Sequence, residues 1–236
     1  MEIFISAPFG NYIHPTDTIA VTGTWTLEPR GNRLLSVAKT LRYNFSMGGW
    51  QNKLGLPNPG IDVGLSKIKP DQILSVAQIN GGDFQNLSKI IPFDQNIEVN
   101  LSCPNVDVHF PWISATHFKE TDLRQYCIAK VSPLTSLSDL KFLIDKIGFR
   151  QLHFSNTLPL SNDRGGLSGK TLIPYTKDLI RLTRDNWGDD IEIIAGGGIQ
   201  HIGHVTEYMN AGADHISLGS VCFHPIKLWK LLRALR

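Results

Sequence analysis

Asparagine and cysteine side chains occupy a short segment where an apolar, strand-like run ends. The segment 100–105, NLSCPN, places two asparagines around a cysteine and a proline. Amide side chains both donate and accept hydrogen bonds, so Asn100 and Asn105 suit a planar imide or amide substrate. Cys103 between them is able to act as a base or nucleophile, although a lone cysteine is more often a packing residue. The segment is therefore a candidate site, with packing as the competing interpretation.

Two further strand-like segments carry polar side chains of the same kind. Lys130 lies within the apolar run CIAKVSP (127–133), and RQLHFSNT (150–157) ends in Asn156 and Thr157. A lysine that points into a barrel is costly to bury, so it should meet an anion or a polarisable cofactor. The competing interpretation is a lysine at a strand end that reaches solvent.

Glycine-rich turns follow the last two strand-like segments, as AGGG (195–198) and LGS (218–220). Glycines let a backbone approach a ligand closely, and the corresponding loops of α/β barrels often bind phosphate. The alternative is that they only form tight turns. GGLSGK (165–170) is interpreted as a mobile turn before a helix and lacks the spacing of a Walker loop. His201 and His204 have no evident third ligand, so no metal is predicted.

These residues need a scaffold of buried strands. Eight short apolar runs are near-continuously hydrophobic, as expected for strands of a parallel sheet that is covered on both faces. They are 2–7, 19–26, 72–80, 96–103, 127–133, 150–157, 191–198 and 215–223. Between the later runs lie helical patterns at 136–148, 171–188 and 201–212, each ending at a glycine, and an amphipathic helix over 225–236 closes the chain. The pattern predicts an α/β fold, a parallel (β/α)8 TIM barrel formed by residues 1–236 as one domain.

The N-terminal half is less regular. Residues 7–18 are too short and too rich in turn formers for a crossover helix, and residues 27–71 are expected to form a long loop excursion. The barrel is therefore predicted to have a shortened N-terminal half.

Composition narrows the class of protein. Hydrophobic residues make up 42% and charged residues 19%, which is typical of a globular protein, and a net charge of +2 favours no nucleic-acid partner. No run approaches the length of a membrane span, so no membrane association is expected. Three cysteines without C-x-x-C spacing and without a secretory leader predict reduced thiols and a cytoplasmic location.

Taken together, these segments resemble the dihydroorotate dehydrogenases, in the same order along the chain from about Thr22 to Phe223. The similar pieces are TWTLEPRGN (24–32), NKLGLPNPG (52–60), NLSCPN (100–105), AKVSP (129–133), SNT (155–157), GGLSGK (165–170), AGGGI (195–199) and LGS (218–220). The resemblance implies an FMN-dependent oxidation of dihydroorotate to orotate, a step of pyrimidine biosynthesis.

The resemblance also implies roles for individual residues. Cys103 would take a proton from C5 of dihydroorotate while hydride leaves C6 for flavin N5, and Lys130 would contact the pyrimidine edge of the flavin. The substrate ring would be held by Asn52, Asn100, Asn105 and Asn156, with Thr157 beside the fourth. The cofactor would be bound by Thr22, Asn100, Lys130, Gly166, Gly197, Gly198, Gly219 and Ser220, the last four of these around the phosphate.

Two departures from the family pattern bear on activity. Gly23 stands where family members usually carry a lysine that helps to bind the flavin and the substrate carboxylate, with Lys53 as a conceivable substitute. The segment after Asn105 lacks a clear helical period and includes the loop that normally carries the base over the substrate. A trimmed loop would leave the site open to water and impair catalysis.

Three hypotheses follow. The first is a dihydroorotate dehydrogenase with a soluble electron acceptor, such as fumarate or a nicotinamide-linked partner, in a homodimer. The second is an FMN oxidoreductase acting on another cyclic amide or dihydropyrimidine, because Gly23 removes a carboxylate anchor. The third is a catalytically impaired barrel kept as a binding module. Bleaching of a bound flavin by dihydroorotate would distinguish the first from the others.

Overall fold

Eight parallel strands close into a barrel, as the sequence predicts. The computed structural model describes residues 1–102, 112–118, 123–161 and 164–236. Around the barrel the strand order is β1-β12-β11-β8-β7-β6-β5-β2, and every neighbouring pair is parallel. The strands are β1 (Ile3–Ile5), β2 (Ile19–Val21), β5 (Gln72–Val76), β6 (Ile97–Asn100), β7 (Cys127–Val131), β8 (Gln151–Phe154), β11 (Glu192–Gly196) and β12 (His215–Leu218).

The apolar residues of the strands divide between two cores. One set packs outward against the helices, where Leu74 of β5 and Val99 of β6 belong to the large core cluster. The alternate residues point into the barrel, where Phe4, Ile73 and Ile128 belong to a smaller apolar cluster. Strands β5 to β8 are buried at every position, so even the polar residues that alternate with apolar ones in β6 (IEVN) and β8 (QLHF) are shielded from solvent.

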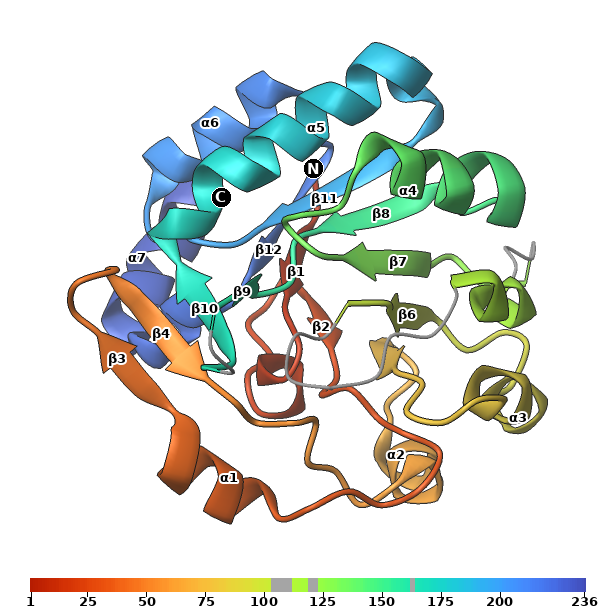
Figure 1. Ribbon diagram of the computed structural model, residues 1–236. Coiled ribbons are helices and arrows are strands. Elements are labelled where there is room, and N and C mark those ends of the chain that lie inside the picture. The colour runs from red at the N-terminus through yellow and green to blue at the C-terminus, as the bar shows by residue number, and fades with distance from the viewer. Residues whose placement is uncertain (103–111, 119–122, 162–163) are drawn as a thin grey trace.

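Helices surround the barrel (Figure 1); the four helical segments predicted between residues 136 and 236 form helices there, whereas the helices before residue 136 were not predicted. Ser136 caps α4 in a reciprocal capping box with Asp139, and Gly148 and Gly212 end their helices at positive φ. The helices are α2 (Ile61–Lys67), α3 (Asp83–Ile90), α4 (Leu137–Lys141) with a π-helical continuation (Phe142–Ile147), α5 (Ile173–Trp187), α6 (Ile202–Ala211) and α7 (Pro225–Leu235). Short 3-10 helices occur at Phe9–Asn11, Trp112–Phe118, Lys170–Leu172, Gly188–Asp190 and Ser220–Phe223.

The connection between β1 and β2 confirms the shortened N-terminal half. It contains a single 3-10 turn, Phe9–Asn11, in place of a crossover helix. Gly10 makes this possible, because a Cβ on it would lie 2.2 Å from the Val21 carbonyl oxygen. The turn therefore packs directly on the backbone of β2.

The prediction of a long loop over 27–71 is wrong. This segment forms α1 (Arg33–Thr40), the hairpin of β3 (Arg42–Asn44) and β4 (Gly49–Asn52), and α2. The hairpin continues into a four-stranded antiparallel sheet with β10 (Gly166–Gly169) and β9 (Leu158–Pro159), in the order β3-β4-β10-β9. GGLSGK is accordingly a strand and not a mobile turn. In Figure 1 this small sheet and α1 lie beside the barrel.

An aromatic contact joins the small sheet to the barrel wall. The ring centroids of Trp50 in β4 and of Phe223, which follows β12, are 4.5 Å apart, and Phe223 also contacts Phe9 edge-on.

Among the described residues, the helices are too short or too polar to cross a lipid bilayer.

Candidate functional site

Most of the predicted site residues lie at the carboxyl end of the barrel. Asn100 ends β6, Asn156 follows β8, and Lys130 lies on β7 beside Asn100 in register. Because all barrel strands run parallel, their carboxyl ends share one face, which is where α/β barrels carry their active sites. Thr22 after β2, Gly197 and Gly198 after β11, and Gly219 and Ser220 after β12 lie at the same end.

Asn100 and Asn156 are in direct contact. The Asn156 side-chain amide donates to Asn100 Oδ1 at 2.9 Å and to the Ser102 carbonyl at 3.0 Å, and its own oxygen accepts from the Thr157 backbone N–H at 2.9 Å. Asn100 donates in turn to Thr24 Oγ1 at 3.2 Å. The two predicted substrate-binding amides are thus held in fixed orientations by neighbouring strands.

The asparagine pair continues into a buried network below it. Thr24 shares a hydrogen bond of 3.0 Å with Ser75, and the Ser75 hydroxyl donates to Glu98 Oε1 at 3.0 Å. Glu98 then meets Lys130 at 3.5 Å and His153 at 2.6 Å. Lys130 therefore points into the barrel and faces an anion, and is not a lysine reaching solvent.

Glu98 and His153 were not among the predicted site residues. Each is a polar residue inside a short apolar strand, in IEVN and QLHF, and that interruption is the only local signal. Burial by itself would raise the pKa of Glu98, but Lys130, His153 and Ser75 lower it to about 2. Burial and the charge of Lys130 lower the pKa of His153, against the opposing effect of Glu98. The cluster thus holds an ionised carboxylate next to a neutral imidazole.

Two hydroxyls near the asparagine pair are buried and have no hydrogen-bond partner within the described ranges, Ser102 Oγ and Thr157 Oγ1. A buried hydroxyl without a partner costs free energy, so such groups are expected where a ligand binds. Both residues are neighbours of predicted site residues, Ser102 in sequence to Cys103 and Thr157 to Asn156.

The remaining predicted residues belong to the small sheet beside the barrel or lie outside the described ranges. Asn52 ends β4 of the small sheet and is paired with Gly166 of β10. Cys103 and Asn105 lie outside the described residues. The other two cysteines, Cys127 and Cys222, are buried, and burial raises the pKa of Cys222 to about 12. Neither described thiol has the character of a catalytic base.

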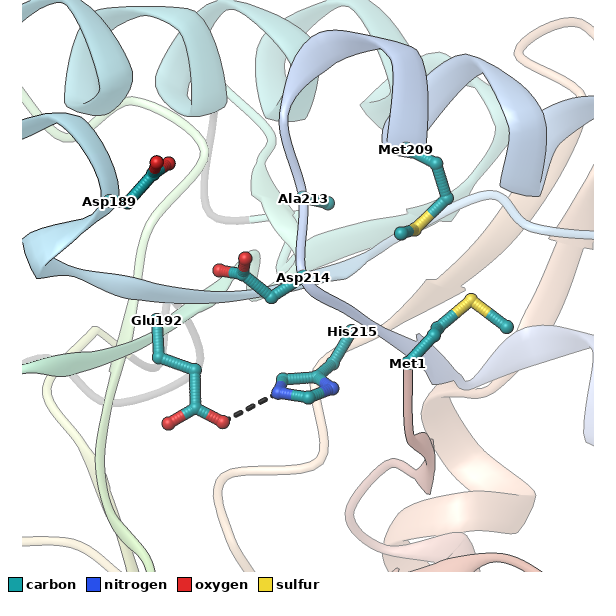
Figure 2. Close-up of a pocket in the computed structure, with 7 residues that line it drawn as sticks. All are labelled: Met1, Asp189, Glu192, Met209, Ala213, Asp214 and His215. Atoms are coloured by element: carbon teal, nitrogen blue, oxygen red, sulfur yellow. Dashed lines mark hydrogen bonds and ion pairs between the residues drawn. The ribbon is translucent and has the colours of Figure 1, made fainter.

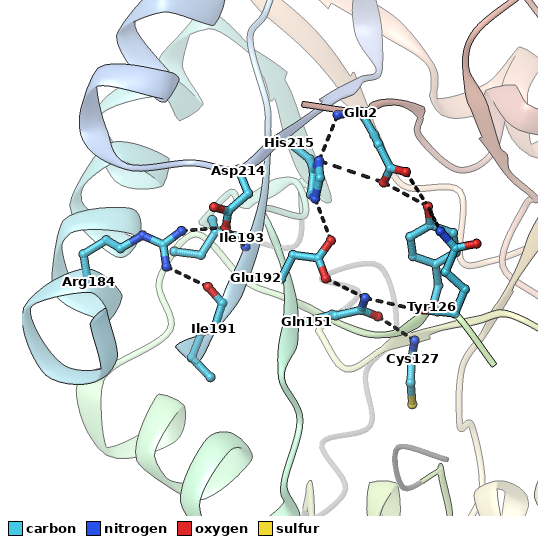
Figure 3. Close-up of polar contacts among 11 residues, drawn as sticks. Glu2, Tyr126, Cys127, Gln151, Arg184, Ile191, Glu192, Ile193, Asp214 and His215 are labelled. Carbon is cyan, nitrogen blue, oxygen red and sulfur yellow. Dashed lines mark hydrogen bonds and ion pairs between the residues drawn. The ribbon is translucent and has the colours of Figure 1, made fainter. Parts of the chain in front are cut away.

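A second polar cluster lies at the opposite, amino end of the strands (Figure 3). It is a ring of hydrogen bonds that joins five consecutive strands of the barrel. Its links run from Tyr126 to Glu2 (2.9 Å), from the Glu2 backbone N–H to His215 Nδ1 (2.9 Å), from His215 Nε2 to Glu192 (2.6 Å), from Gln151 to Glu192 (2.7 Å), and from the Cys127 backbone N–H to Gln151 (2.8 Å). We call these side chains the amino-end ring.

Three members of the amino-end ring have the ligand types of a metal site. Ligand atoms of Glu2, Glu192 and His215 lie within 4.8 Å of one another, and the latter two line a pocket with Met1, Asp189, Met209, Ala213 and Asp214 (Figure 2). Both ring nitrogens of His215 are already used, however. Nδ1 accepts the Glu2 N–H, so the proton lies on Nε2 and is donated to Glu192. A metal ion at Nε2 would require an imidazole without any proton, so we assign the ring a structural role.

Comparison with known proteins agrees with the architecture. The family model described as dihydroorotate dehydrogenase matches residues 147–232. The catalytic subunit of dihydroorotate dehydrogenase B (NAD(+)) from Cutibacterium acnes is 30% identical over 89% of this chain and 77% of its own length, and that from Endomicrobium trichonymphae is 32% identical over 85% and 72%. Dihydroorotate dehydrogenase A (fumarate) from Lactiplantibacillus plantarum is 27% identical over 85% of this chain and 74% of the relative.

The same fold occurs in a solved structure. Dihydroorotate dehydrogenase from Eimeria tenella, crystallised with ferulenol, superposes with a TM-score of 0.74 at 17% identity, covering 100% of this chain and 80% of that one. At that identity the likeness concerns the fold alone. The sequence relatives support a family assignment, because two of them are at least 30% identical over more than two thirds of their length. The chain belongs to the dihydroorotate dehydrogenase family, whose members are FMN-dependent oxidoreductases.

Proposed function

We propose that this protein is an FMN-dependent enzyme that oxidises dihydroorotate to orotate. The observation that carries the proposal is the contact of Asn100 with Asn156, joined through one buried network to Lys130, at the carboxyl end of a barrel of this family. Amide groups suit the imide-like edge of a pyrimidine, and a buried ammonium suits a flavin that takes up electrons.

The glycine loops support a cofactor phosphate. The backbone N–H groups of Gly198 and Ser220 donate to no acceptor within the described ranges. A Cβ on Gly219 would meet only Ser6, at 3.7 Å, so neighbouring protein atoms leave space beside this backbone for a ligand that approaches it closely.

Gly197 and Gly198 have a different reason to be glycine. Both have positive φ, and a Cβ on either would clash with the segment 169–173. This loop packs tightly under the end of β10, so the small sheet fixes the position of the loop. We propose that the N–H groups of Gly197, Gly198, Gly219 and Ser220 bind the phosphate, with Thr22 and Gly166 as further cofactor contacts.

Bound FMN would supply a two-electron acceptor, and residues of the chain would stabilise its charge, orient the substrate and accept the proton. Lys130 would stabilise negative charge at the pyrimidine edge of the flavin, and Asn52, Asn100, Asn105 and Asn156 would orient the substrate ring, with Thr157 beside it. Cys103 would accept the proton from C5 of the substrate. Ser102, which precedes it, is anchored by its carbonyl to Asn156, and this contact would hold the base near the substrate.

A second candidate substrate is an uncharged dihydropyrimidine or related cyclic amide. It is favoured by Gly23, which offers no charge for a carboxylate and whose backbone N–H donates to Asn11 Oδ1 at 2.9 Å. Lys53 is exposed and lies on the chain directly after Asn52, so it remains the proposed replacement anchor for dihydroorotate.

An anaerobic reduction experiment tests the proposal. FMN-loaded protein is mixed with dihydroorotate or, separately, with dihydrouracil, and loss of the flavin absorption is followed. Bleaching by dihydroorotate supports the first substrate, and Cys103→Ala is expected to slow it at least a hundredfold, because a general base contributes about 10²–10⁴-fold. Bleaching by dihydrouracil alone would favour the second. Bound FMN that neither compound bleaches would contradict both and point to a binding module.

The electron acceptor is assigned in the same assay. The relatives named above carry NAD(+) and fumarate in their names. Reoxidation of the bleached protein by fumarate, compared with reoxidation by NAD+ with and without a partner flavoprotein, distinguishes the two. We also propose that the protein acts on its small-molecule substrate as a homodimer.

A further inference from the structure

Three titratable side chains from adjacent strands meet inside the barrel. Glu98 of β6, Lys130 of β7 and His153 of β8 are 0%, 6% and 2% exposed. Lys130 and His153 are paired in register, and Glu98 lies two residues before Asn100, one layer deeper in the barrel than the asparagine pair. The cluster thus lies directly beneath the proposed substrate site.

The two oxygens of Glu98 are shared unequally. Oε2 accepts a short hydrogen bond from His153 Nδ1 at 2.6 Å, whereas Oε1 meets Ser75 Oγ at 3.0 Å and Lys130 Nζ at 3.5 Å. An ionised carboxylate only accepts hydrogen bonds, so the neutral His153 carries its proton on Nδ1. Charge-assisted N–H···O bonds are usually about 2.7–2.9 Å long, so the lysine contact is a loose one.

Lys130 is consequently buried, charged and incompletely paired. Its ammonium has three N–H donors, and the described residues offer it one acceptor at 3.5 Å. A buried ammonium in this state is costly, and a ligand with negative charge beside Nζ would complete its coordination.

The position of the His153 ring is fixed from the far side as well. Nε2 lies 3.1 Å from the point where a Cβ on Gly196 would be, and Ser217 Cβ lies 3.3 Å from that point. Glycine at 196 therefore leaves room for the ring between β8 and β11. The imidazole is held between this backbone and the Glu98 carboxylate.

We propose that His153 is a positioning residue for Lys130. By donating Nδ1–H to Glu98, it keeps the carboxylate from closing on the lysine, so that the ammonium stays available to the anionic edge of bound FMN. The inference rests on the proposed function, because it requires FMN beside Lys130. Without the His153 donor, Glu98 would pair closely with Lys130 and cancel more of its charge at the cofactor.

Three variants test this through the two-electron midpoint potential of bound FMN. His153→Phe keeps a ring of similar shape but removes the donor, and it is expected to lower the potential by about 30 mV, a tenfold weaker preference for the reduced cofactor. His153→Asn places an N–H at the position of Nδ1 and should restore most of the wild-type potential. Glu98→Gln removes the negative charge and should raise the potential. Opposite shifts in the Phe and Gln variants are not expected from general damage to the fold.

A measurement without cofactor checks the same arrangement. In ¹⁵N spectra of the cofactor-free wild-type chain, the His153 side chain should show the Nδ1–H tautomer. An Nε2–H tautomer or a doubly protonated ring would overturn the inference even if His153→Phe did not fold. Bound FMN with an unchanged potential in His153→Phe would overturn it while the proposed function stands. Wild-type protein that binds no FMN would overturn both.

Discussion

Glu98 has no exposed surface, yet its carboxylate remains ionised inside the barrel. Burial opposes this, but the Lys130 ammonium, the His153 ring and the Ser75 hydroxyl together stabilise the charged form more strongly. Removing one partner of such a buried pair leaves an uncompensated charge, which is more damaging than the net value of the pair suggests. The groups that keep Glu98 ionised are therefore also needed for the stability of the fold.

Acid should weaken the fold through this residue. The folded pKa of Glu98 is about 2 and its ordinary value is 4.5, so the unfolded chain takes up the proton first as the pH falls. The stability that the carboxylate contributes is present above about pH 4.5 and is lost toward pH 2, with about 2 kcal/mol gone by pH 3. Urea unfolding at pH 7, 4.5 and 3 measures this. Glu98→Gln should show the smaller fall between pH 4.5 and 3.

The control for that experiment is Asp178→Asn, whose carboxylate is 77% exposed and lies 3.8 Å from Arg181. It should keep the pH dependence of the wild type. His153 acts in a higher pH window: its pKa is lowered in the folded state, so stability begins to fall as the pH drops below about 6.5. Identical pH profiles for wild type and Glu98→Gln below pH 4.5 would contradict the assignment of Glu98.

Among the elements of the fold, the barrel strands are joined by the amino-end ring at their amino ends, opposite the proposed site. It links β7, β8, β11, β12 and β1 through side chains and two backbone N–H groups, beneath the apolar layer that contains Phe4 and Ile128. The hydrogen bond from His215 and that from Gln151 lower the pKa of Glu192, against the effect of its partial burial. The ring is thus a fully paired network that connects the first strand of the chain to the last ones.

Glu192→Ala should destabilise the protein by about 1–3 kcal/mol, because His215 Nε2 loses its acceptor and Gln151 Nε2 keeps only its bond to the Gln125 carbonyl oxygen. FMN affinity should be unchanged, since the proposed cofactor site lies at the other end of the strands. The matched control is Asp189→Ala in the same pocket, whose carboxylate is fully exposed at 4.0 Å from Arg184. It is expected to leave the urea midpoint unaltered. A loss of FMN affinity in Glu192→Ala would contradict the separation of the two ends.

At the scale of the whole molecule, the barrel closes although its first connection has no helix. β1 pairs with both β2 and β12, so the sheet has no open edge there. The small sheet adds packing at the carboxyl end of the barrel, where the end of β10 lies against the loop of Gly197 and Gly198. A cofactor bound between this sheet and the barrel would contact both parts and stabilise them together.

FMN should therefore raise the melting temperature of the whole chain, and riboflavin should raise it less because it lacks the phosphate. A ligand that binds only the folded state adds about 2.7 kcal/mol at a hundred times its Kd, or about 5–10 °C for a chain of this size. Thermal unfolding monitored by circular dichroism measures both.

Gly219→Ala is the matching variant for the melting experiment. The added Cβ has room, since it meets only Ser6 at 3.7 Å, and each ligand-induced shift is measured from the variant's own melting temperature without ligand. Its response to FMN should fall toward that of riboflavin. Equal stabilisation by FMN and riboflavin in the wild type would contradict a phosphate site on these glycines.

Local sequence patterns were enough to predict the barrel, but they left two directions open for Lys130, which the structure shows to be buried. Buried strands and glycine-terminated helices are encoded in local periodicity and in capping residues such as Ser136, so they are visible without a partner. The placement of polar residues at strand ends followed from the same local pattern, and parallel closure then brings Asn100 and Asn156 to one face.

The contacts of these residues could not be predicted from the sequence, because they depend on how the strands assemble. The GLSG sequence of β10 has weak strand propensity and therefore predicts a turn, but it forms a strand by pairing with β4, more than 100 residues earlier in the chain. The Glu98–His153 contact and the amino-end ring depend likewise on the register of separate strands. Such contacts are non-local, since a side chain's partners inside a closed barrel come from strands that only the fold makes neighbours.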